Sequence, residues 1–302
     1  MNDDPFDPPV GVAQPLGPGV RRVLAPNASP MTYRGTNTYL LGAREIAVID
    51  PGPDHAAHLE AILGALETGQ RITHIFVTHS HVDHAPLARR LSAVTGAPVL
   101  AFGPSGSGRS EIMTQLAATG LSDAGEGIDP DFAPDQVLED GETITGPDWH
   151  LTAIWTPGHL GNHLSFAWND VVFTGDLVMG WASSLVSPPD GDLTDFMTSC
   201  RRLRARGASV FHAGHGAPIE DPMARLDWLI EHRLSREAAI LKCLSAGAAT
   251  TSELAAAIYT DTPTPLIPAA KRNILAHLVD LYGKSLVAPM GPLTEAARFE
   301  KT

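Results

Sequence analysis

The feature that most constrains the fold is a run of β-branched and apolar residues, 72–78, that leads directly into the segment His79-Ser-His-Val-Asp-His84. The apolar run predicts a buried strand. Because alternate residues of an extended chain share a face, His79 and His81 point the same way, while Asp83 and His84 turn toward a second position. Three imidazoles and a carboxylate at the end of a buried strand indicate a metal site rather than a polar surface turn.

Three further candidate ligands follow at predicted turns and strand ends. His159 follows Thr-Pro-Gly, Asp176 follows Phe-Thr-Gly, and His215 follows His-Ala-Gly. A neighbouring glycine lets the backbone approach a crowded centre. Each residue alone is typical of an ordinary turn, but together and in this order they complete a ligand set. Imidazole and carboxylate ligands suit Zn²⁺ first, with Mn²⁺ and Fe²⁺ as alternatives.

The rest of the first 222 residues predicts a layered α/β domain. Apolar runs indicate strands at 38–41, 46–50, 72–78, 97–102, 149–155, 164–168, 171–174 and 209–212, and helical spacing indicates helices at 55–66, 85–94 and 195–206. The first 25 residues, rich in Pro, Gly and Asp, predict an extended arm. Loop-forming residues at 104–108 and 122–134 predict a long, partly mobile insertion.

The sequence changes character near residue 222, so we expect domains at 1–222 and 223–302. Helical patterns cover 223–244, a segment from Thr251, and 268–282, followed by a short strand at 285–288. Thr250 and Glu253 have the spacing of a capping box. Three helices and a strand in this order predict a small winged-helix-like module.

Composition limits the partners. The chain of 302 residues carries 21 basic and 34 acidic side chains, a net charge of −13, which disfavours double-stranded DNA. The N-terminal segment does not resemble a secretory signal, and no apolar run is long enough to span a membrane. Cys200 and Cys243 do not form a short metal-binding pair, so we expect two reduced, buried thiols and a cytoplasmic protein.

The combination of these motifs resembles the metallo-β-lactamase superfamily. The resemblance rests on H-x-H-x-D-H at 79–84, the three later ligands, Gly35-Thr-Asn-Thr-Tyr39 and Ile49-Asp-Pro-Gly52, and it spans roughly residues 20–220. It implies an αββα sandwich of two mixed sheets flanked by helices, with metals at one edge. His232-Arg-Leu-Ser-Arg-Glu237 and the C-terminal module resemble the beta-lactamase-like protein 2 group, which disfavours antibiotic hydrolysis.

The resemblance also implies a division of the ligands between two divalent ions. By it, His79, His81 and His159 hold the first ion, Asp83, His84 and His215 hold the second, and Asp176 bridges them. Two such ions lower the pKa of a bridging water from about 15.7 toward roughly 7. The resulting hydroxide would attack a carbonyl carbon or a phosphorus, with Asp83 orienting it, so Asp83 and Asp176 are the expected catalytic residues.

Three functions remain open at this point. The acidic charge favours cleavage of a small ester or thioester, whereas the resemblance to the beta-lactamase-like protein 2 group implies an endoribonuclease acting on single-stranded RNA. In the third, the protein is a non-enzymatic nucleic-acid binder or sensor. We expect the C-terminal module to cover the rim of the active site or to mediate a homodimer.

Several weaker candidates have two interpretations each. Asp50 is either a support for a metal-binding imidazole or a turn residue, and for His163 we favour a plain strand residue over a supporting one. The segment 187–192 either lines the substrate entrance or forms a rigid proline turn. A flexible loop is the favoured interpretation of the glycine-rich 103–108, as is a solvated helix face for Lys271, Arg272 and Asn273.

Overall fold

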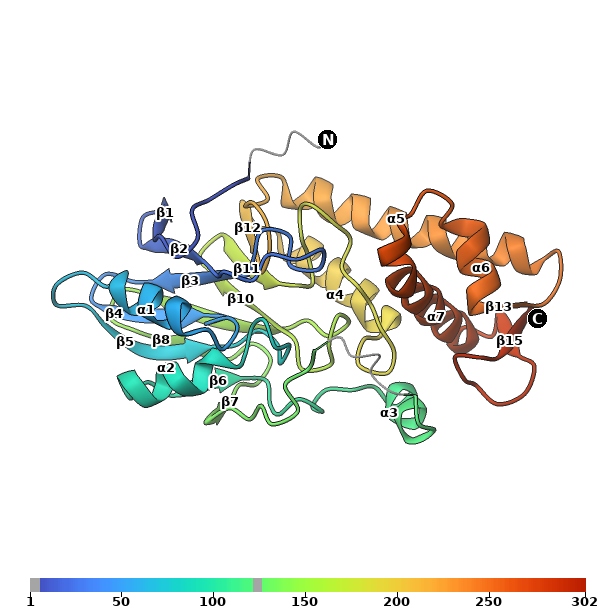
Figure 1. Cartoon of the computed structure of the whole chain (residues 1–302), viewed down its shortest axis with the longest axis horizontal. Helices are drawn as coiled ribbons and strands as arrows, with labels where there is room; N and C mark the ends of the chain where they lie inside the picture. The colour runs from blue at the N-terminus through green and yellow to red at the C-terminus, as the bar shows by residue number, and fades with distance from the viewer. Residues whose placement is uncertain (1–5, 122–126) are drawn as a thin grey trace.

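Two β-sheets stacked face to face form the centre of the larger, N-terminal part of the molecule (Figure 1). The computed structural model describes residues 6–121 and 127–302. The first sheet has the strand order β1-β2-β3-β4-β5-β6-β7 and mixes antiparallel and parallel pairs. Its strands are β1 (Gln14–Gly17), β2 (Val20–Leu24), β3 (Asn37–Leu41), β4 (Glu45–Ile49), β5 (Arg71–Phe76), β6 (Val99–Ala101) and β7 (Gln136–Val137).

The second sheet has the order β12-β11-β10-β9-β8, and only its β11–β12 pair is parallel. Its strands are β8 (Thr143–Thr145), β9 (His150–Trp155), β10 (Leu164–Trp168), β11 (Val171–Gly175) and β12 (Val210–Ala213). Large apolar side chains of both sheets, among them Phe76, Phe166 and Phe173, fill the space between them. The rings of Phe76 and Phe166 meet edge to face at 5.2 Å.

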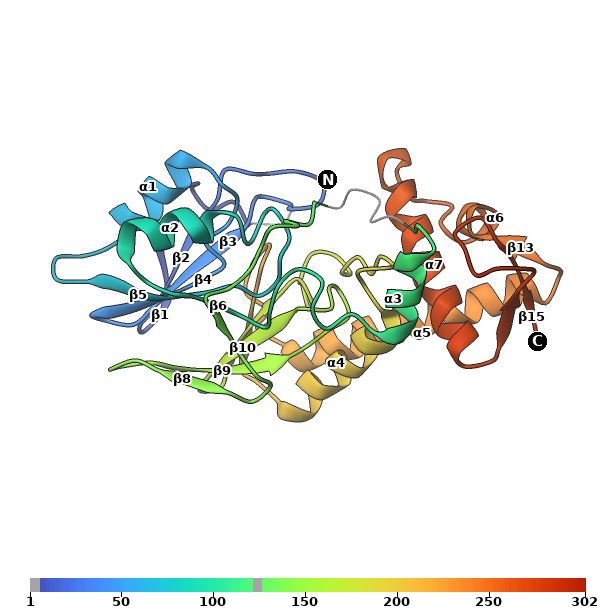
Figure 2. The same ribbon diagram turned by 90° about the horizontal axis from the view of Figure 1, so that it is seen from below.

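Helices cover both outer faces, which completes the αββα order (Figure 2). The first sheet is covered by α1 (Ala56–Gly64) and α2 (Leu87–Thr95), whose apolar faces join one core cluster with β4 and β5. The second sheet is covered by α4 (Leu193–Arg206) and the start of α5 (Pro222–Leu244) through Phe196, Leu203 and Leu226. The predicted sandwich is therefore confirmed.

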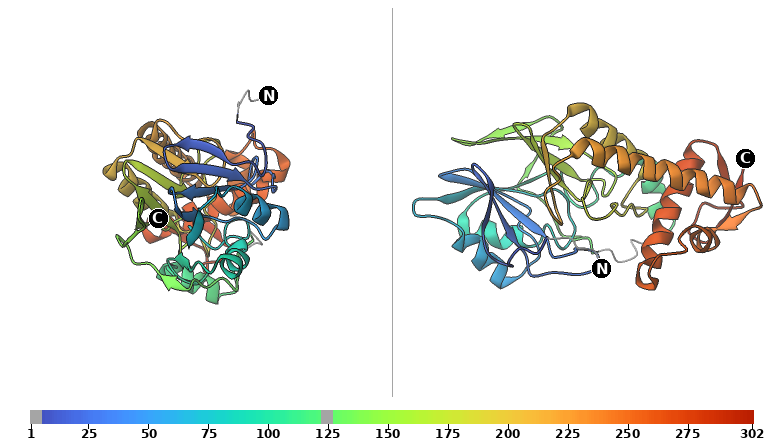
Figure 3. Two further views of the ribbon diagram at one scale, coloured as in Figure 1. Left: turned by 90° about the vertical axis from the view of Figure 1, so that its left-hand side faces the viewer. Right: turned by 90° about the horizontal axis from the view of Figure 1, so that it is seen from above.

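The C-terminal part has the order of helices and strands of a winged-helix module, and the long α5 reaches from the sandwich to it (Figure 3, right). It consists of the second half of α5, the helices α6 (Thr251–Ile258) and α7 (Ile267–Gly283), a 3₁₀ turn at Thr264–Leu266, and a three-stranded sheet. The strands of that sheet are β13 (Ala249–Thr250), β14 (Val287–Pro289) and β15 (Arg298–Lys301). Both halves of the predicted capping box at Thr250 and Glu253 are present. The boundary at residue 222 stays a prediction.

The prediction of an extended N-terminal arm was wrong for the described residues, because β1 and β2 extend the first sheet. Val20, Val23 and Leu24 are buried in the core. The two arginines between them are not fully exposed to solvent. Instead, Arg21 donates to the Ala65 carbonyl at 2.5 Å, and the Arg22 guanidinium lies over the Phe6 ring at 4.8 Å.

The predicted insertion also contains structure. Helix α3 (Glu111–Ala118) begins at Ser110, whose hydroxyl accepts from the Met113 backbone amide. Met113 and Leu116 pack against Leu275 and Val279 of α7, so α3 joins the two domains (Figure 2). Residues 122–126 of the predicted mobile stretch lie outside the described residues. The short strands β7, β8, β13 and β15 were also not predicted.

Two smaller findings concern composition. Both cysteines are free, as expected, but only Cys200 is fully buried, whereas Cys243 is half-buried. None of the helices in residues 6–121 and 127–302 is long and apolar enough to cross a membrane.

Candidate metal centre

The seven predicted ligands meet at one edge of the sandwich. His79 to His84 follow β5, His159 lies in the connection between β9 and β10, and Asp176 and His215 follow β11 and β12. Segments that are far apart in the sequence meet here because β5, β11 and β12 all end at this edge. All but Asp83 are buried, and the Asp83 side chain is 21% exposed.

Short distances between the ligand atoms define the centre. Nδ1 of His81 lies 3.0 Å from Nε2 of both His79 and His159. On the other side, Nε2 of His215 lies 3.1 Å from Asp83 Oδ2 and 3.3 Å from both His84 Nε2 and Asp176 Oδ2. Three groups of potential ligands have all their atoms within 4.8 Å of one another: His79–His81–His159, His79–His84–Asp176 and Asp83–His84–His215.

The outer nitrogens of four imidazoles have fixed partners. Nδ1 of His159 donates to the Leu185 carbonyl at 2.7 Å, and Nδ1 of His215 donates to the Gly35 carbonyl at 3.1 Å. Nδ1 of His84 faces Asp50, and Nδ1 of His79 faces the Thr78 hydroxyl. With the outer nitrogen of each ring held by its partner, Nε2 is the nitrogen that faces the centre and can bind a cation, as in imidazoles that bind metal.

Asp50 supports two of these imidazoles at once. Its Oδ2 accepts from His84 Nδ1 at 2.9 Å and from the Thr78 hydroxyl at 2.8 Å, while Oδ1 accepts from the Thr78 amide at 2.7 Å. The Thr78 hydroxyl in turn accepts from His79 at 2.9 Å. Asp50 has a left-handed backbone, φ 50°, which is uncommon for a residue other than glycine. These contacts favour the interpretation of Asp50 as a support for the candidate metal-binding imidazoles over its interpretation as a turn residue.

His163 also supports the centre, so the preferred interpretation of it as a plain strand residue was wrong. Its Nε2 accepts from the Asp176 backbone amide at 3.3 Å, and its ring lies 5.2 Å from that of His79. Gly175, φ 48°, makes room for it, because a Cβ there would lie 2.6 Å from His163 Nε2. A Cβ at Gly214 would lie 2.4 Å from Asp176 Oδ1, so the glycine before His215 is required as well.

Burial and charge divide the centre into two unlike halves. Burial lowers the pKa of His81 to about 3 and that of His79 well below its ordinary value. Burial also opposes a charge on His215, but the Asp176 carboxylate outweighs it and raises the pKa of His215 to about 10. The pKa of His84 is raised well above its ordinary value by its carboxylate neighbours, again against the effect of burial.

The donor set fits a pair of divalent cations. Two nitrogens that each bind zinc at about 2.0–2.1 Å in a tetrahedral arrangement lie roughly 3.4 Å apart, close to the separations of the ring nitrogens here. Asp176 Oδ1 is buried and, in the part of the chain that the structure describes, has no hydrogen-bond partner. A buried carboxylate oxygen without a hydrogen bond is costly, and a cation would satisfy it.

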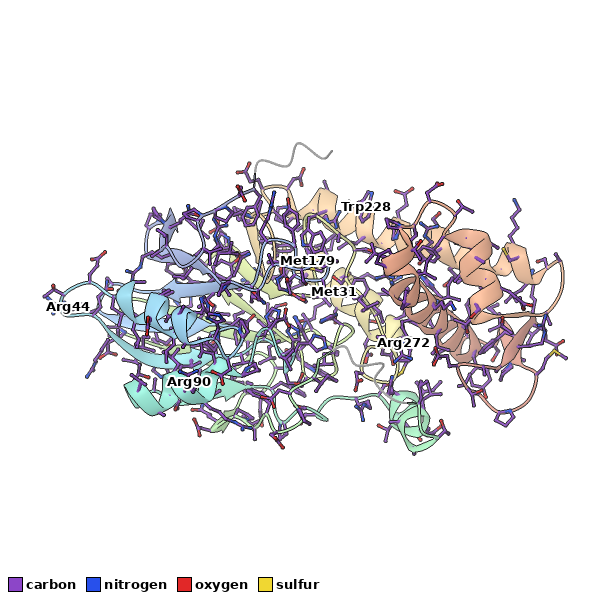
Figure 4. The ribbon with its side chains drawn as sticks, in the orientation of Figure 1. Met31, Arg44, Arg90, Met179, Trp228 and Arg272 are labelled. Carbon is purple, nitrogen blue, oxygen red and sulfur yellow. The ribbon has the colours of Figure 1, made fainter. Side chains whose placement is uncertain are left out.

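A cavity with two lobes opens onto the centre, and His159 and Asp176 border both lobes. The inner lobe, of about 240 Å³, is mostly apolar. Its walls include Met31, Met179, Trp181, Leu185, Tyr259 and Leu266. The outer lobe, of about 440 Å³, is also mostly apolar, through residues such as Val82 and Pro268, but it is bordered by His81, Asp83 and Arg272 as well. Met31 and Met179 lie between the sandwich and the C-terminal helices (Figure 4).

The C-terminal domain thus lines the cavity, in agreement with the expectation that it covers the rim. The solvated-face interpretation of Arg272 and Asn273 was wrong, because Arg272 is buried and both residues border the cavity. The sequence reasoning missed the apolar walls. An ordinary apolar helix pattern cannot distinguish residues that face a core from residues that face a cavity.

Two other candidates proved structural. No residue of 187–192 lines either lobe of the cavity, while Asp192 caps α4 and Asp190 pairs with Arg109, which favours the rigid turn. In the glycine-rich 103–108, the Ser105 hydroxyl donates to the Asp129 carbonyl, which agrees with a structural loop.

Comparison with known proteins places these features in context. Residues 31–215 match the metallo-beta-lactamase superfamily, and residues 250–288 match the beta-lactamase associated winged helix domain. A Caenorhabditis elegans protein named beta-lactamase-like protein 2 homolog is 30% identical over 281 residues, which cover 90% of this chain and 87% of the relative.

Two further relatives extend the comparison. An Aspergillus fumigatus protein named atrochrysone carboxyl ACP thioesterase is 31% identical over 286 residues, covering 89% of this chain and 81% of that protein. The crystal structure of a metallo-beta-lactamase family protein from Thermus thermophilus is similar with a TM-score of 0.75 and 27% identity, over 95% of this chain and 100% of the other.

Proposed function

The chain belongs to the metallo-beta-lactamase superfamily of hydrolases, and we propose that it uses two divalent metal ions, Zn²⁺ first, to cleave an ester or thioester of a small molecule. The observation that carries this proposal is the apolar cavity that ends at His159 and Asp176. A cavity of this kind suits an organic acyl group. The name of the thioesterase relative supports the same class of substrate.

We assign the ligands as the sequence predicted. His79, His81 and His159 would hold one ion, and Asp83, His84 and His215 the other, with Asp176 between them. Two of the three ligand groups support this division directly, and the third places Asp176 between His79 and His84. When bound, such a pair supplies a hydrolytic nucleophile at neutral pH by lowering the pKa of water, and it polarises the carbonyl that is attacked.

The protein groups then have distinct roles. Asp83 is the most exposed of the seven side chains and borders the outer lobe, so its carboxylate is placed to accept a hydrogen bond from the attacking water. Burial favours the neutral acid, but the charges of His84 and His215 outweigh it and lower the pKa of Asp83 below its ordinary value. With a cation bound, both imidazoles would be neutral, and the cation would then favour the Asp83 carboxylate in their place. The apolar walls exclude bulk water from the acyl group.

Single-stranded RNA is the competing substrate. The net charge of −13 opposes a polyanion at long range, and the inner lobe offers apolar walls rather than a basic groove. The hydrolase relatives leave the non-enzymatic alternative without support. A homodimer and a cytoplasmic location stay predictions.

The experiment combines metal analysis with two probes. We expect about two equivalents of metal per chain, together with turnover of a thioester and no cleavage of a labelled single-stranded RNA. A chelator should abolish turnover, and added Zn²⁺ should restore it. RNA cleavage that depends on the metal, with an intact thioester, would overturn the proposal and favour the endoribonuclease.

A further inference from the structure

The side-chain amide of Asn273 has only one orientation that its surroundings allow. Asn273 lies in the second turn of α7 and borders the inner lobe together with His159 and Asp176. Two groups donate to its Oδ1, the Arg233 guanidinium at 3.0 Å and the Val186 backbone amide at 3.2 Å. Because both neighbours can only donate, the oxygen must face them, and the NH₂ group must face away.

Burial and further contacts fix the position of Arg233, and Arg233 in turn fixes the orientation of the Asn273 amide. Its side chain is 2% exposed, its second terminal nitrogen donates to the Ser184 carbonyl, and its guanidinium lies 5.1 Å from the centre of the Phe196 ring. An arginine stays charged at any pH at which the protein is folded. The buried cation therefore fixes both Asn273 and the loop that forms the cavity wall.

The same loop is held at two more points by the C-terminal helices. Arg225 of α5 donates to the carbonyls of Met179 and Ala182 at 2.7 and 2.6 Å, and Arg272 of α7 donates to the Ser187 hydroxyl at 3.0 Å. Figure 4 shows Arg272 at the end of α7 that faces the sandwich. These contacts make the inner lobe a preformed site, which lowers the entropic cost of binding there.

The amide nitrogen of Asn273 is a donor without an acceptor. Within residues 6–121 and 127–302, nothing accepts a hydrogen bond from its Nδ2. The lobe around it is largely apolar. A polar donor in such surroundings gains most from a ligand that brings its own acceptor.

We propose that Asn273 determines specificity, by donating from Nδ2 to an oxygen on the acyl group of the substrate. This inference rests on the proposed function. His159 and Asp176 border both lobes, so the bond to be cleaved would lie where the two lobes meet. Asn273, in contrast, borders the inner lobe alone. The inner lobe then takes an apolar acyl group that carries an oxo or hydroxyl oxygen, and the outer lobe takes the leaving thiol or alcohol.

The test uses thioesters of N-acetylcysteamine that differ only in that oxygen: hexanoyl, 3-oxohexanoyl and 5-oxohexanoyl. The variant Asn273→Asp keeps the oxygen that Arg233 and Val186 need and replaces only the donor. We expect the wild type to favour at least one oxo substrate. For that substrate the variant should lose about 10- to 100-fold in kcat/KM, mainly through KM, and stay within about threefold on the hexanoyl thioester.

The control is Asn169→Asp, which makes the same change of charge at an exposed turn between β10 and β11. It should match the wild type on all three substrates. Because the hexanoyl rate is measured on the same preparation, misfolding of Asn273→Asp would show as an equal loss on every substrate. Equal losses with native metal content and unfolding temperature, or no loss on the oxo substrates, would overturn the inference. If the wild type cleaves no thioester at all, the proposed function fails first and this inference fails with it.

Discussion

The metal centre and the cavity that leads to it are built in opposite ways. The centre consists of polar side chains that the strand ends of the sandwich bring together, each supported by hydrogen bonds such as those of Asp50. The cavity consists mostly of apolar side chains from loops and from the C-terminal helices. Under the proposed function, the first region would determine the reaction and the second would select the substrate.

The difference lies in what a substitution can change. Seven interdependent ligands leave little freedom, because each supports a shared ion and its neighbours. The cavity walls are independent apolar contacts, each of which can be exchanged for another at modest cost. The two regions should therefore respond differently to substitution, and the predictions below test that separation.

Loss of the shared carboxylate should have the largest effect. In Asp176→Ala we expect loss of metal and a fall in turnover of at least about 1,000-fold, since both proposed ions depend on this residue. Elemental analysis and a thioester assay measure the two quantities. His150→Ala removes an exposed imidazole outside the cluster and should change neither. Full metal occupancy and full activity in Asp176→Ala would contradict the assignment of Asp176 as a shared ligand.

A substitution behind the ligands should have a smaller effect confined to the centre. Asp50→Asn keeps an acceptor for the Thr78 amide but removes the charge that faces His84 Nδ1. Loss of such a support typically costs about 10- to 100-fold in metal affinity. We expect that loss in a competition titration against a chelating dye, with an unchanged KM at saturating metal. A raised KM with unchanged metal affinity would contradict the separation of the two regions.

The seven candidate ligands could be selected from the sequence because their signals are local. Four of them lie within six residues after a predicted strand, and the other three each follow a glycine. The structure brings all seven together, while their roles stay a prediction. Asp50 was recognised as a candidate for the same reason. The supporting role of His163 was not predicted, because it depends on two contacts that the sequence near residue 163 does not show. These are the hydrogen bond from the Asp176 backbone amide and the contact with the His79 ring.

The cavity and part of the fold escaped prediction because their signals are not local. Nothing near Asn273 in the sequence shows that Arg233, 40 residues away, orients its amide. Helix α3 was missed because it is short and lies between loop-forming segments, although Ser110 before Ile112, Met113 and Leu116 is a recognisable start. Strand β2 was missed because its short apolar run lies in a segment rich in Pro, Gly and Asp, which are typical of turns and loops.

The smallest predicted effect concerns the pH dependence of the free energy of unfolding that comes from His277 of α7, the helix that also carries Asn273. His277 of α7 is 1% exposed, and in the described part of the chain neither of its ring nitrogens has a hydrogen-bond partner. Burial, with help from the charges of Arg233 and Lys284, lowers the pKa of His277 well below 6.5. In the unfolded chain this histidine takes up a proton near pH 6.5, whereas in the folded protein it stays neutral.

Unfolding therefore binds one more proton as the pH falls below about 6.5, and the free energy of unfolding should drop by at most about 1.4 kcal/mol per pH unit from this residue. The loss continues until the pH reaches the lowered pKa of the folded state. Because acid would also displace a metal from its histidine ligands, the quantity to compare is the change in unfolding free energy between pH 7.5 and 5.5 for the wild type and for His277→Leu, from urea titrations. The ligands are the same in both proteins, so their contribution cancels, and the variant should lose about 1 kcal/mol less than the wild type. An equal loss in both would mean that His277 does not contribute to the loss of stability in acid, which would contradict the prediction.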